Sequence, residues 1–217
     1  FASSQTSHVF DTLKNPDIPG EVGVMIEIDP LMGLRMINDG SVSLLSTRRE
    51  GKTNVSTVSW QMPLSQDPPM LGISLTPSCL SNELLRESGE FVLSIPDASL
   101  IAETHYCGTH RGDSEDNVRS MQFRTMRARK VIPLLVTNCI GHLECAVRDV
   151  YPFGDRLFYA SRVVAALVEE DYFDNGWNEN AQTLHHLGGD RYKTGGGILD
   201  AKKWPLPQQM PNLPPLF

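Results

Sequence analysis

Cysteine and histidine side chains lie at short spacing in two segments of the chain, an arrangement that could bind zinc. They are Cys139, His142 and Cys145 in one segment, and His105, Cys107 and His110 in the other. The residues at 139–147 read as a β-strand, in which successive side chains point to opposite faces. Cys139 and Cys145 are then expected on one face and His142 on the other, so these three side chains cannot close on one metal ion. We predict no metal site and interpret Cys145 as a small buried side chain.

Several common catalytic and nucleotide-binding motifs do not occur in the sequence. It holds no G-x-S-x-G elbow, no G-x-G-x-x-G turn and no Walker loop, so no motif supports an esterase-type serine, a Rossmann-type dinucleotide site or a P-loop. A cysteine or serine paired with one of the six histidines is a further alternative that no motif supports. The acidic cluster at 113–116 lacks the spacing of a calcium loop, and we interpret it as a solvated helix start.

A more specific pattern is the density of serine and threonine in three successive segments, 54–60, 63–69 and 74–81. The last segment leads into a predicted helix, whose unpaired N–H groups and positive dipole end attract an anion. A hydroxyl-rich strand beside a phosphate pocket suits flavin mononucleotide (FMN), because the ring needs polar partners along its edge and the tail ends in a phosphate. Helix capping and ordinary surface polarity explain the same residues, so the sequence pattern alone leaves both interpretations open.

Short apolar or alternating segments, bounded by Gly, Pro and Asp, predict a mainly β protein with a few helices. The predicted strands are 22–28, 41–47, 54–60, 70–75, 91–95, 142–150 and 157–168. Residues 48–52 and 151–155 carry the turn chemistry of hairpins, so the strands that they join are expected to pair antiparallel. The pattern favours an antiparallel barrel or sandwich.

Two helices are expected in the middle of the chain, over 78–87 and 97–106. The candidate N-caps are Ser78 or Ser81 for the first helix, and Asp97 or Ser99 for the second. Gly89 lies just past the end of the first helix, where a glycine is common. The first helix follows directly on the hydroxyl-rich segments, so its N-terminus belongs to the same predicted site.

The chain is long enough to form one domain with its own core. Its 217 residues carry 19 Lys and Arg against 26 Asp and Glu, which gives a formal net charge of -7. The sequence has no basic cluster and no apolar run near the roughly 20 residues that span a bilayer. Neither nucleic acid nor a membrane is therefore an expected partner. The four scattered cysteines fit a reducing, cytoplasmic location.

We divide the chain into an N-terminal extension at 1–20, one domain at 21–193 and a Gly- and Pro-rich tail at 194–217. The tail opens on three consecutive glycines and holds five of the 15 prolines. Such a composition cannot continue as a helix or a central strand. The tail is therefore expected to be extended, either free or lying across a neighbouring subunit.

Several motifs, in the same order along the chain, resemble those of the flavin reductase-like family. They are STRREGKTNVSTVSWQMPLSQDPPMLGISLTPSCLSNELLRESGEFVLSIP from residue 46, HYCG at 105–108, GHLEC at 141–145, GDRLFYASRVVAA at 154–166 and LHHLGGDRY at 184–192. The resemblance implies an FMN-binding split β-barrel, which is a Greek-key antiparallel barrel, built as a homodimer with each flavin near the subunit interface. The antiparallel barrel predicted from the strand pattern agrees with it.

By position, the resemblance also implies which residues hold the cofactor. The flavin ring falls on Ser56, Thr57, Val58 and Ser59, with Thr47 and Asn54 on neighbouring strand ends, and the phosphate falls on Ser74, Thr76, Ser78, Cys79, Leu80 and Ser81. The chain departs from the family where Ser78 and Cys79 replace the common Arg or Lys, and where Arg156 replaces a His near the flavin. Arg156 is counted as cofactor-binding, and Cys79, at a helix start, is expected to be reactive.

The implied activity is that of an NAD(P)H:flavin oxidoreductase, which transfers a hydride from NADH or NADPH to flavin N5. Thr57 or Ser59 is expected to bond to the ring edge, and Arg156 to stabilise the negative charge of the reduced ring. No side chain is assigned a catalytic role. Two alternatives stay open: an FMN electron-transfer protein of the flavoredoxin type with a redox protein partner, and a binding module that has lost the cofactor.

Overall fold

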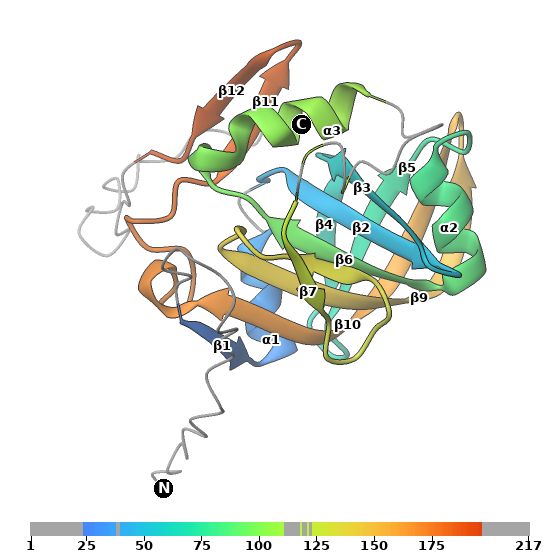
Figure 1. Ribbon diagram of the computed structural model, residues 1–217. Coiled ribbons are helices and arrows are strands. Elements are labelled where there is room, and N and C mark those ends of the chain that lie inside the picture. The colour runs from blue at the N-terminus through green and yellow to red at the C-terminus, as the bar shows by residue number, and fades with distance from the viewer. Residues whose placement is uncertain (1–23, 38–39, 111–117, 119–120, 122, 197–217) are drawn as a thin grey trace, which may run out of the picture.

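Antiparallel strands make up most of the computed structural model, which describes residues 24–37, 40–110, 118, 121 and 123–196 (Figure 1). Within these residues, eight strands share one sheet in the order β3-β2-β6-β9-β10-β5-β4, with β1 paired to β10. Their bounds are β1 Met25–Ile28, β2 Ser43–Arg49, β3 Lys52–Val58, β4 Gln61–Ser65, β5 Met70–Leu75, β6 Glu90–Ile95, β9 Gly141–Phe153 and β10 Arg156–Glu169.

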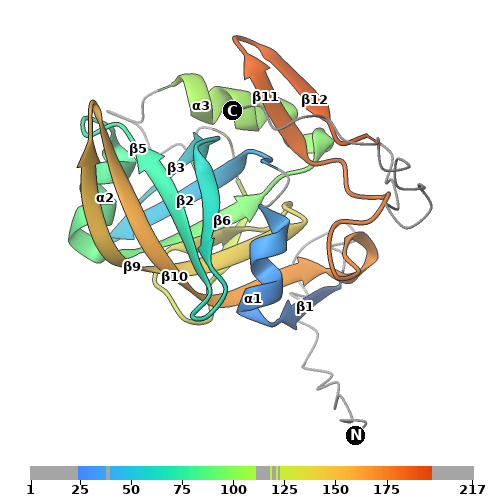
Figure 2. The same cartoon turned by 180° about the vertical axis from the view of Figure 1, so that it is seen from behind.

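The sheet curls on itself because its two outermost strands follow one another in the chain. β3 and β4 stand at opposite ends of the strand order, yet only Ser59 and Trp60 separate them in sequence. The Trp60 carbonyl accepts a hydrogen bond from Ser74 N at 2.9 Å, which ties this connection to β5. Irregularities in the β9–β10 ladder, near Ser161 and Ala165, bend this long hairpin around the core. The result is the antiparallel barrel expected from the sequence (Figure 2).

All seven predicted strands are present, and most of their ends differ by a few residues from the prediction. β5 matches its predicted range of 70–75, whereas β9 continues to Phe153. Both predicted hairpins are confirmed, with Gly51 (φ 83°) and Gly154 (φ 57°) in the left-handed conformation that tight turns require. The sequence pattern does not predict β4, because it holds a proline and turns its apolar side chains outward.

Helix α2 (Leu80–Ser88) occupies the first predicted helical segment. Its N-cap is Cys79, so the expectation of a cap at Ser78 or Ser81 is wrong. The Cys79 backbone is extended and its carbonyl accepts the first intrahelical bond, from Asn82 N at 3.0 Å, which places Ser81 inside the first turn. Gly89 (φ 69°) ends the helix, as expected. The helix packs on β2.

The second predicted helix begins as a short 3-10 turn, η2 (Ala98–Leu100), and continues as α3 (Ile101–Thr109). Asp97 is confirmed as the cap, since its carboxylate accepts a hydrogen bond from Ser99 N at 2.9 Å. Helix α3 packs on β3. Three further short elements are α1 (Pro30–Gly33), η1 (Leu34–Met36) and η3 (Glu170–Tyr172).

The core fills the inside of the barrel and continues beneath α1. Its largest fully buried side chains include Leu45, Leu71, Phe91 and Tyr159. Helix α1 lies very close to the barrel strands, because a Cβ atom on Gly33 would be 2.6 Å from the Cβ of Ala166. Only a glycine lets the helix approach β10 at this distance.

In the described ranges, two small hairpins lie outside the main sheet, and neither is predicted. They are β7 (Thr125–Arg127) with β8 (Leu134–Val136), and β11 (Leu184–Gly188) with β12 (Arg191–Thr194). The β11–β12 hairpin stands beside α3 at one end of the barrel (Figures 1 and 2). Its exposed, polar strands give little of the alternating signal on which strand prediction depends.

Some predictions fall on residues that the structure does not describe. The extension at 1–20, the acidic cluster at 113–116 and the tail beyond 196 lie outside the described residues, so the three domain boundaries stay predictions. Among the helices of the described residues, none is long and apolar enough to cross a membrane.

Candidate functional site

A cavity of about 440 Å³ opens where the ends of β3, β5 and β10 meet the start of α2, the end of α3 and strand β11. Its lining residues are Asn54, Ser56, Thr57, Val58, Ser59, Trp60, Ser74, Leu75, Thr76, Ser78, Cys79, Leu80, Ser81, Cys107, Gly108, His110, Arg156 and His186. Segments far apart in sequence thus contribute to one polar site.

The structure brings together every cofactor-binding residue predicted from the sequence except Thr47. That side chain is fully buried on β2, opposite Asn54 of β3, and does not line the cavity. The others line it, so the segments that were expected to hold the ring and the phosphate share one space. Contact of these residues with a flavin stays a prediction.

The start of α2 provides the anion-attracting end of the cavity. Leu80 and Ser81 lie in the first turn, where backbone N–H groups have no intrahelical acceptor. The Ser81 hydroxyl is held by β3, since Asn54 Nδ2 donates to it at 2.8 Å and Ser56 Oγ lies 2.7 Å from it. Hydrogen bonds between β3 and α2 therefore fix the helix start against the strand that carries most of the hydroxyls.

Among the described residues that line the cavity, Arg156 is the one Lys or Arg side chain, and none carries a carboxylate. Its Nη1 donates to Thr76 Oγ1 at 3.0 Å, and its guanidinium lies over the Trp60 ring, 4.5 Å from the ring centroid. Its buried Nε has no hydrogen-bond partner in the described part of the chain and lies 3.8 Å from Asp155 Oδ1. The cavity therefore presents a held cation to an anionic ligand.

Helix α3 forms a second wall of the cavity and is pressed against β3. The Thr57 hydroxyl donates to the Thr104 carbonyl, and a Cβ atom on Gly108 would lie 3.3 Å from the Thr57 Cβ. The Cys107 thiol is almost completely buried on this wall, and its burial, with Glu103 nearby, raises its pKa to about 12. Cys107 is therefore a neutral thiol at physiological pH.

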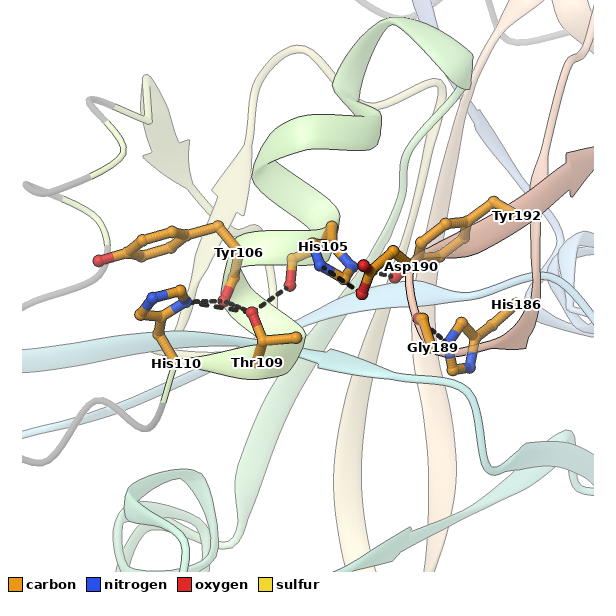
Figure 3. Close-up of polar contacts among 8 residues, drawn as sticks. All are labelled: His105, Tyr106, Thr109, His110, His186, Gly189, Asp190 and Tyr192. Carbon is orange, nitrogen blue, oxygen red and sulfur yellow. Dashed lines mark hydrogen bonds and ion pairs between the residues drawn. The ribbon is translucent and has the colours of Figure 1, made fainter.

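The β11–β12 hairpin reaches the cavity through His186 and is tied to α3 by a small cluster of side chains (Figure 3). His105 of α3 lies edge-on to the Tyr192 ring, with its Nδ1 3.4 Å from the Tyr192 hydroxyl and its Nε2 3.6 Å from Asp190 Oδ1. His186 Nε2 donates to the Gly189 carbonyl at 3.0 Å, within the hairpin turn. These contacts hold the hairpin over the end of α3.

Sequence reasoning did not assign six of the lining residues to the site. They are Trp60, Leu75, Cys107, Gly108, His110 and His186. Trp60 and Leu75 adjoin assigned residues, whereas Cys107 and His186 fall in the HYCG and LHHLGG motifs, which carry the resemblance but no assigned role. Long-range packing of α3 and the hairpin brings these residues to the cavity, and local patterns do not report it.

Cys139, His142 and Cys145 do not lie on one continuous strand in the structure, so the alternation of side chains expected over 139–147 does not apply to all three. β9 begins at Gly141, so Cys139 precedes it and packs in a different cluster from Cys145. His142 is buried, with Nδ1 2.9 Å from Ser94 Oγ, and its burial lowers its pKa to about 3. No group of three potential metal ligands occurs among the described residues.

A family model for the flavin reductase like domain matches residues 38–193, which is most of the chain. The chain belongs to the flavin reductase-like family. Its relatives include the Escherichia coli (strain K12) protein YddH, which is 27% identical over 175 residues that cover 75% of this chain and 90% of YddH.

Solved structures of the flavin reductase-like fold confirm the predicted architecture. An FMN-binding domain of a flavin reductases-like enzyme from Shewanella baltica has a TM-score of 0.76 at 20% identity, covering 83% of this chain and 99% of that one. Flavoredoxin from Methanosarcina acetivorans has a TM-score of 0.67 at 27% identity, covering 74% of this chain and 87% of that one. The chain therefore has the split-barrel fold of FMN-binding proteins.

Proposed function

We propose that the cavity binds FMN and that the protein is an FMN-dependent oxidoreductase of the flavin reductase type. One observation carries the proposal: a helix start with free N–H groups, a hydroxyl-rich strand end and a held arginine all face one cavity. The volume of about 440 Å³ lies within the range of small-molecule sites, which is roughly 300–1,000 Å³.

The two ends of the cavity suit the two ends of FMN. The phosphate is expected at the start of α2, where the N–H groups of Leu80 and Ser81 and the Ser78 hydroxyl supply donors without a lysine. The flavin ring is expected along the end of β3, beside Trp60 and the hydroxyls of the strand. When bound, FMN supplies the capacity to accept a hydride from NADH or NADPH.

The hydrogen bonds of the protein refine the roles expected for Thr57 and Ser59. The Thr57 hydroxyl already donates its hydrogen to the Thr104 carbonyl, so it can offer a ligand only a lone pair. Ser59 directly follows β3 and is exposed, and its hydroxyl hydrogen has no acceptor among the described residues, so it is available to a ring oxygen or nitrogen. Arg156 carries the positive charge that stabilises a negatively charged reduced ring.

An FMN electron carrier of the flavoredoxin type is the second candidate. The 27% identity to the flavoredoxin of Methanosarcina acetivorans favours it, since this relation extends over three quarters of the chain. A net charge of -7 is compatible with a basic redox partner. The four free cysteines suit the cytoplasmic location that we propose for either function.

Absorption spectra of the purified protein, recorded with FMN present and oxygen excluded, test these proposals. Flavin absorption that bleaches on addition of NADH or NADPH supports the oxidoreductase. A bound flavin that ignores both nucleotides but is reduced by dithionite favours the electron carrier. A protein that does not retain FMN at any concentration overturns both and leaves a binding module on the same fold.

We also propose that the protein is a homodimer, assembled through the outer face of β4, β5, β10 and β9. Cross-strand pairing places Tyr151 beside Phe158, Phe158 beside Ser74, and Ser74 next to Trp60 on this face. Trp60, Met62, Tyr151 and Phe153 are about half or more exposed. Such an apolar surface favours a protein partner. Because Ser74 and Trp60 also line the cavity, a second copy seated here would adjoin the flavin site.

A further inference from the structure

His110 directly follows α3 and is an exposed residue of the cavity lining, and Figure 3 shows its ring beside Tyr106 and Thr109. It stacks on the Tyr106 ring, with the ring centroids 3.9 Å apart and an interplanar angle of 10°. Its Nδ1 lies 3.2 Å from the Tyr106 carbonyl oxygen and 3.1 Å from Thr109 Oγ1. A parallel stack and two polar contacts therefore hold this ring.

The two neighbours of Nδ1 decide which ring nitrogen carries the hydrogen. The Tyr106 carbonyl can only accept, and the Thr109 hydroxyl donates its hydrogen to the His105 carbonyl at 3.0 Å, so it too offers Nδ1 a lone pair. Nδ1 is therefore the protonated nitrogen of the neutral ring, and Nε2 holds the lone pair. Among the described residues, Nε2 has no hydrogen-bond partner.

We propose that His110 is the proton-transfer residue of this cavity, with Nε2 exchanging a proton with the bound redox ligand and Tyr106 and Thr109 as its positioning residues. The proposal rests on the proposed function, because it takes the ligand to be a flavin that gains and loses a proton with its electrons. A base held in one tautomer by its second nitrogen is the usual arrangement of a proton-transferring histidine.

Reduction by a dihydronicotinamide would transfer one hydride from the donor and one proton from His110. The donor would lose a hydride, which is two electrons and one proton, and become a nicotinamide cation, and a bound flavin that takes up this hydride would carry one negative charge. The imidazolium then gives its Nε2 proton to that anion, which becomes the neutral reduced flavin. His110 is left neutral with its hydrogen on Nδ1, and solvent returns the proton to Nε2.

The remaining titratable groups of the cavity are less suited to this role. They are Cys79, Cys107, Arg156 and His186. Arg156 stays protonated at any physiological pH, and Cys107 holds its proton because its pKa is raised to about 12. His186 is exposed, as His110 is, but its Nε2 is engaged by the Gly189 carbonyl at 3.0 Å, and its ring has a tilted contact with Tyr192, at 5.1 Å and 45°, in place of a parallel stack. The Cys79 side chain caps no N–H group of α2, and no hydrogen bond holds it within the described part of the chain.

Nuclear magnetic resonance of the ¹⁵N-histidine-labelled protein tests the first half of the proposal without a measurement of activity. Long-range proton–nitrogen correlation spectra distinguish the two neutral tautomers, and His110→Gln identifies the His110 signals by their loss. We expect the Nδ1–H tautomer, and a change in the His110 signals when FMN is added. The Nε2–H tautomer, or signals that do not respond to bound FMN, would overturn the proposal.

Rates of flavin reduction and of its reoxidation, measured against pH, test the second half. We expect His110→Gln to bind FMN within about threefold of the wild type, to react about 100-fold more slowly and to lose the step in the pH profile that an imidazole contributes. His185→Gln is the matched control, because it removes an imidazole that does not line the cavity and should retain both rate and profile.

The outcomes separate the two claims. His110→Gln that binds FMN and keeps the wild-type rates and pH profile overturns the role of His110 alone. A wild-type protein that does not bind FMN overturns the proposed function, and with it the ligand of this inference, whatever tautomer His110 adopts.

Discussion

Arg156 shows how a single side chain can connect the cavity with the ligand proposed for it. The guanidinium is oriented by the Thr76 hydroxyl and the Trp60 ring, and its Nε lacks a hydrogen-bond partner among the described residues. A guanidinium held in this way loses little further conformational freedom when it binds an anion, because its orientation is already fixed. Arg156 is therefore expected to contribute to FMN affinity as well as to the charge balance of the reduced ring.

Replacing Arg156 with Gln is expected to raise the dissociation constant for FMN by about 10-fold or more. A hydrogen bond to a charged group contributes about 1.5–3 kcal/mol, and the lower end applies because the side chain is about a third exposed. The dissociation constant of Arg156→Lys should lie between those of the wild type and Arg156→Gln, since lysine keeps the charge but loses the planar contact with Trp60. Quenching of FMN fluorescence on binding measures all three affinities.

Arg127→Gln is the matched control for this experiment. Arg127 lies on β7, is exposed, and belongs neither to the cavity nor to the proposed dimer face, so its replacement removes one positive charge without touching either. An equal loss of affinity in both variants would show that Arg156 acts only through the overall charge of the protein.

At the scale of single residues, the sequence predicts the hydroxyls of the site better than its rings. Ser56, Ser78 and Ser81 form a dense local pattern whose chemistry can be recognised without a fold. His110 and His186 are single residues on distant segments, and only the packing of α3 and the hairpin brings them to the cavity. A single histidine in a sequence does not show which cavity its side chain will line or which ring nitrogen will face that cavity.

At the scale of elements, α1 depends on an unusually close approach to the barrel. Gly33→Ala places a Cβ atom 2.6 Å from Ala166 Cβ and 2.8 Å from a methyl carbon of Leu143, in a buried region. Because Ala166 has no rotamer with which to move aside, the helix itself must shift. We expect the substitution to lower the free energy of unfolding by about 1–3 kcal/mol, as measured by urea denaturation.

Gly176→Ala provides the comparison for this prediction. A Cβ atom on Gly176 meets no atom within 4 Å, and its backbone does not adopt the left-handed conformation. The urea midpoint of Gly176→Ala should therefore stay close to that of the wild type. Equal destabilisation by both alanines would mean that the loss of glycine in general, and not the contact with Ala166, determines the cost.

The strands that the sequence predicts are those whose apolar side chains are buried in the core. β2, β5, β6, β9 and β10 alternate or run apolar, and turn glycines mark their hairpins. β4 is missed because its outward side chains are the apolar ones, which reverses the usual signal. The N-cap of α2 is misassigned because Ser81 bonds to Asn54 and Ser56 of the neighbouring strand, a tertiary contact that competes with local capping.

At the scale of the whole molecule, a buried histidine links stability to pH. Burial lowers the pKa of His142 to about 3, whereas an unfolded histidine has a pKa near 6.5. Between these values the unfolded chain binds a proton that the folded chain does not. Stability is therefore lost as the pH falls below about 6.5, by up to about 1.4 kcal/mol per pH unit from this residue.

Urea denaturation at a series of pH values between 7.5 and 4.5 measures this dependence. His142→Gln should be less stable at pH 7.5, because Gln leaves a different shape in the core, but its stability should fall less steeply with acidification than that of the wild type. Equal slopes would show that His142 does not determine the acid sensitivity of the fold.

The apolar outer face makes the oligomeric state the other property of the whole molecule that can be tested. Sedimentation velocity at micromolar concentration is expected to give twice the 24.1 kDa mass of one chain. Met62→Glu, on the outward side of β4, should shift the mass to that of one chain, because it buries a charge without a partner within the proposed interface. Ile132→Glu adds the same charge at an exposed apolar position outside this face and should leave the dimer intact.

Because Trp60 belongs both to this face and to the cavity, dissociation by Met62→Glu should also weaken FMN binding, a coupling that a dimer formed through any other surface would not show.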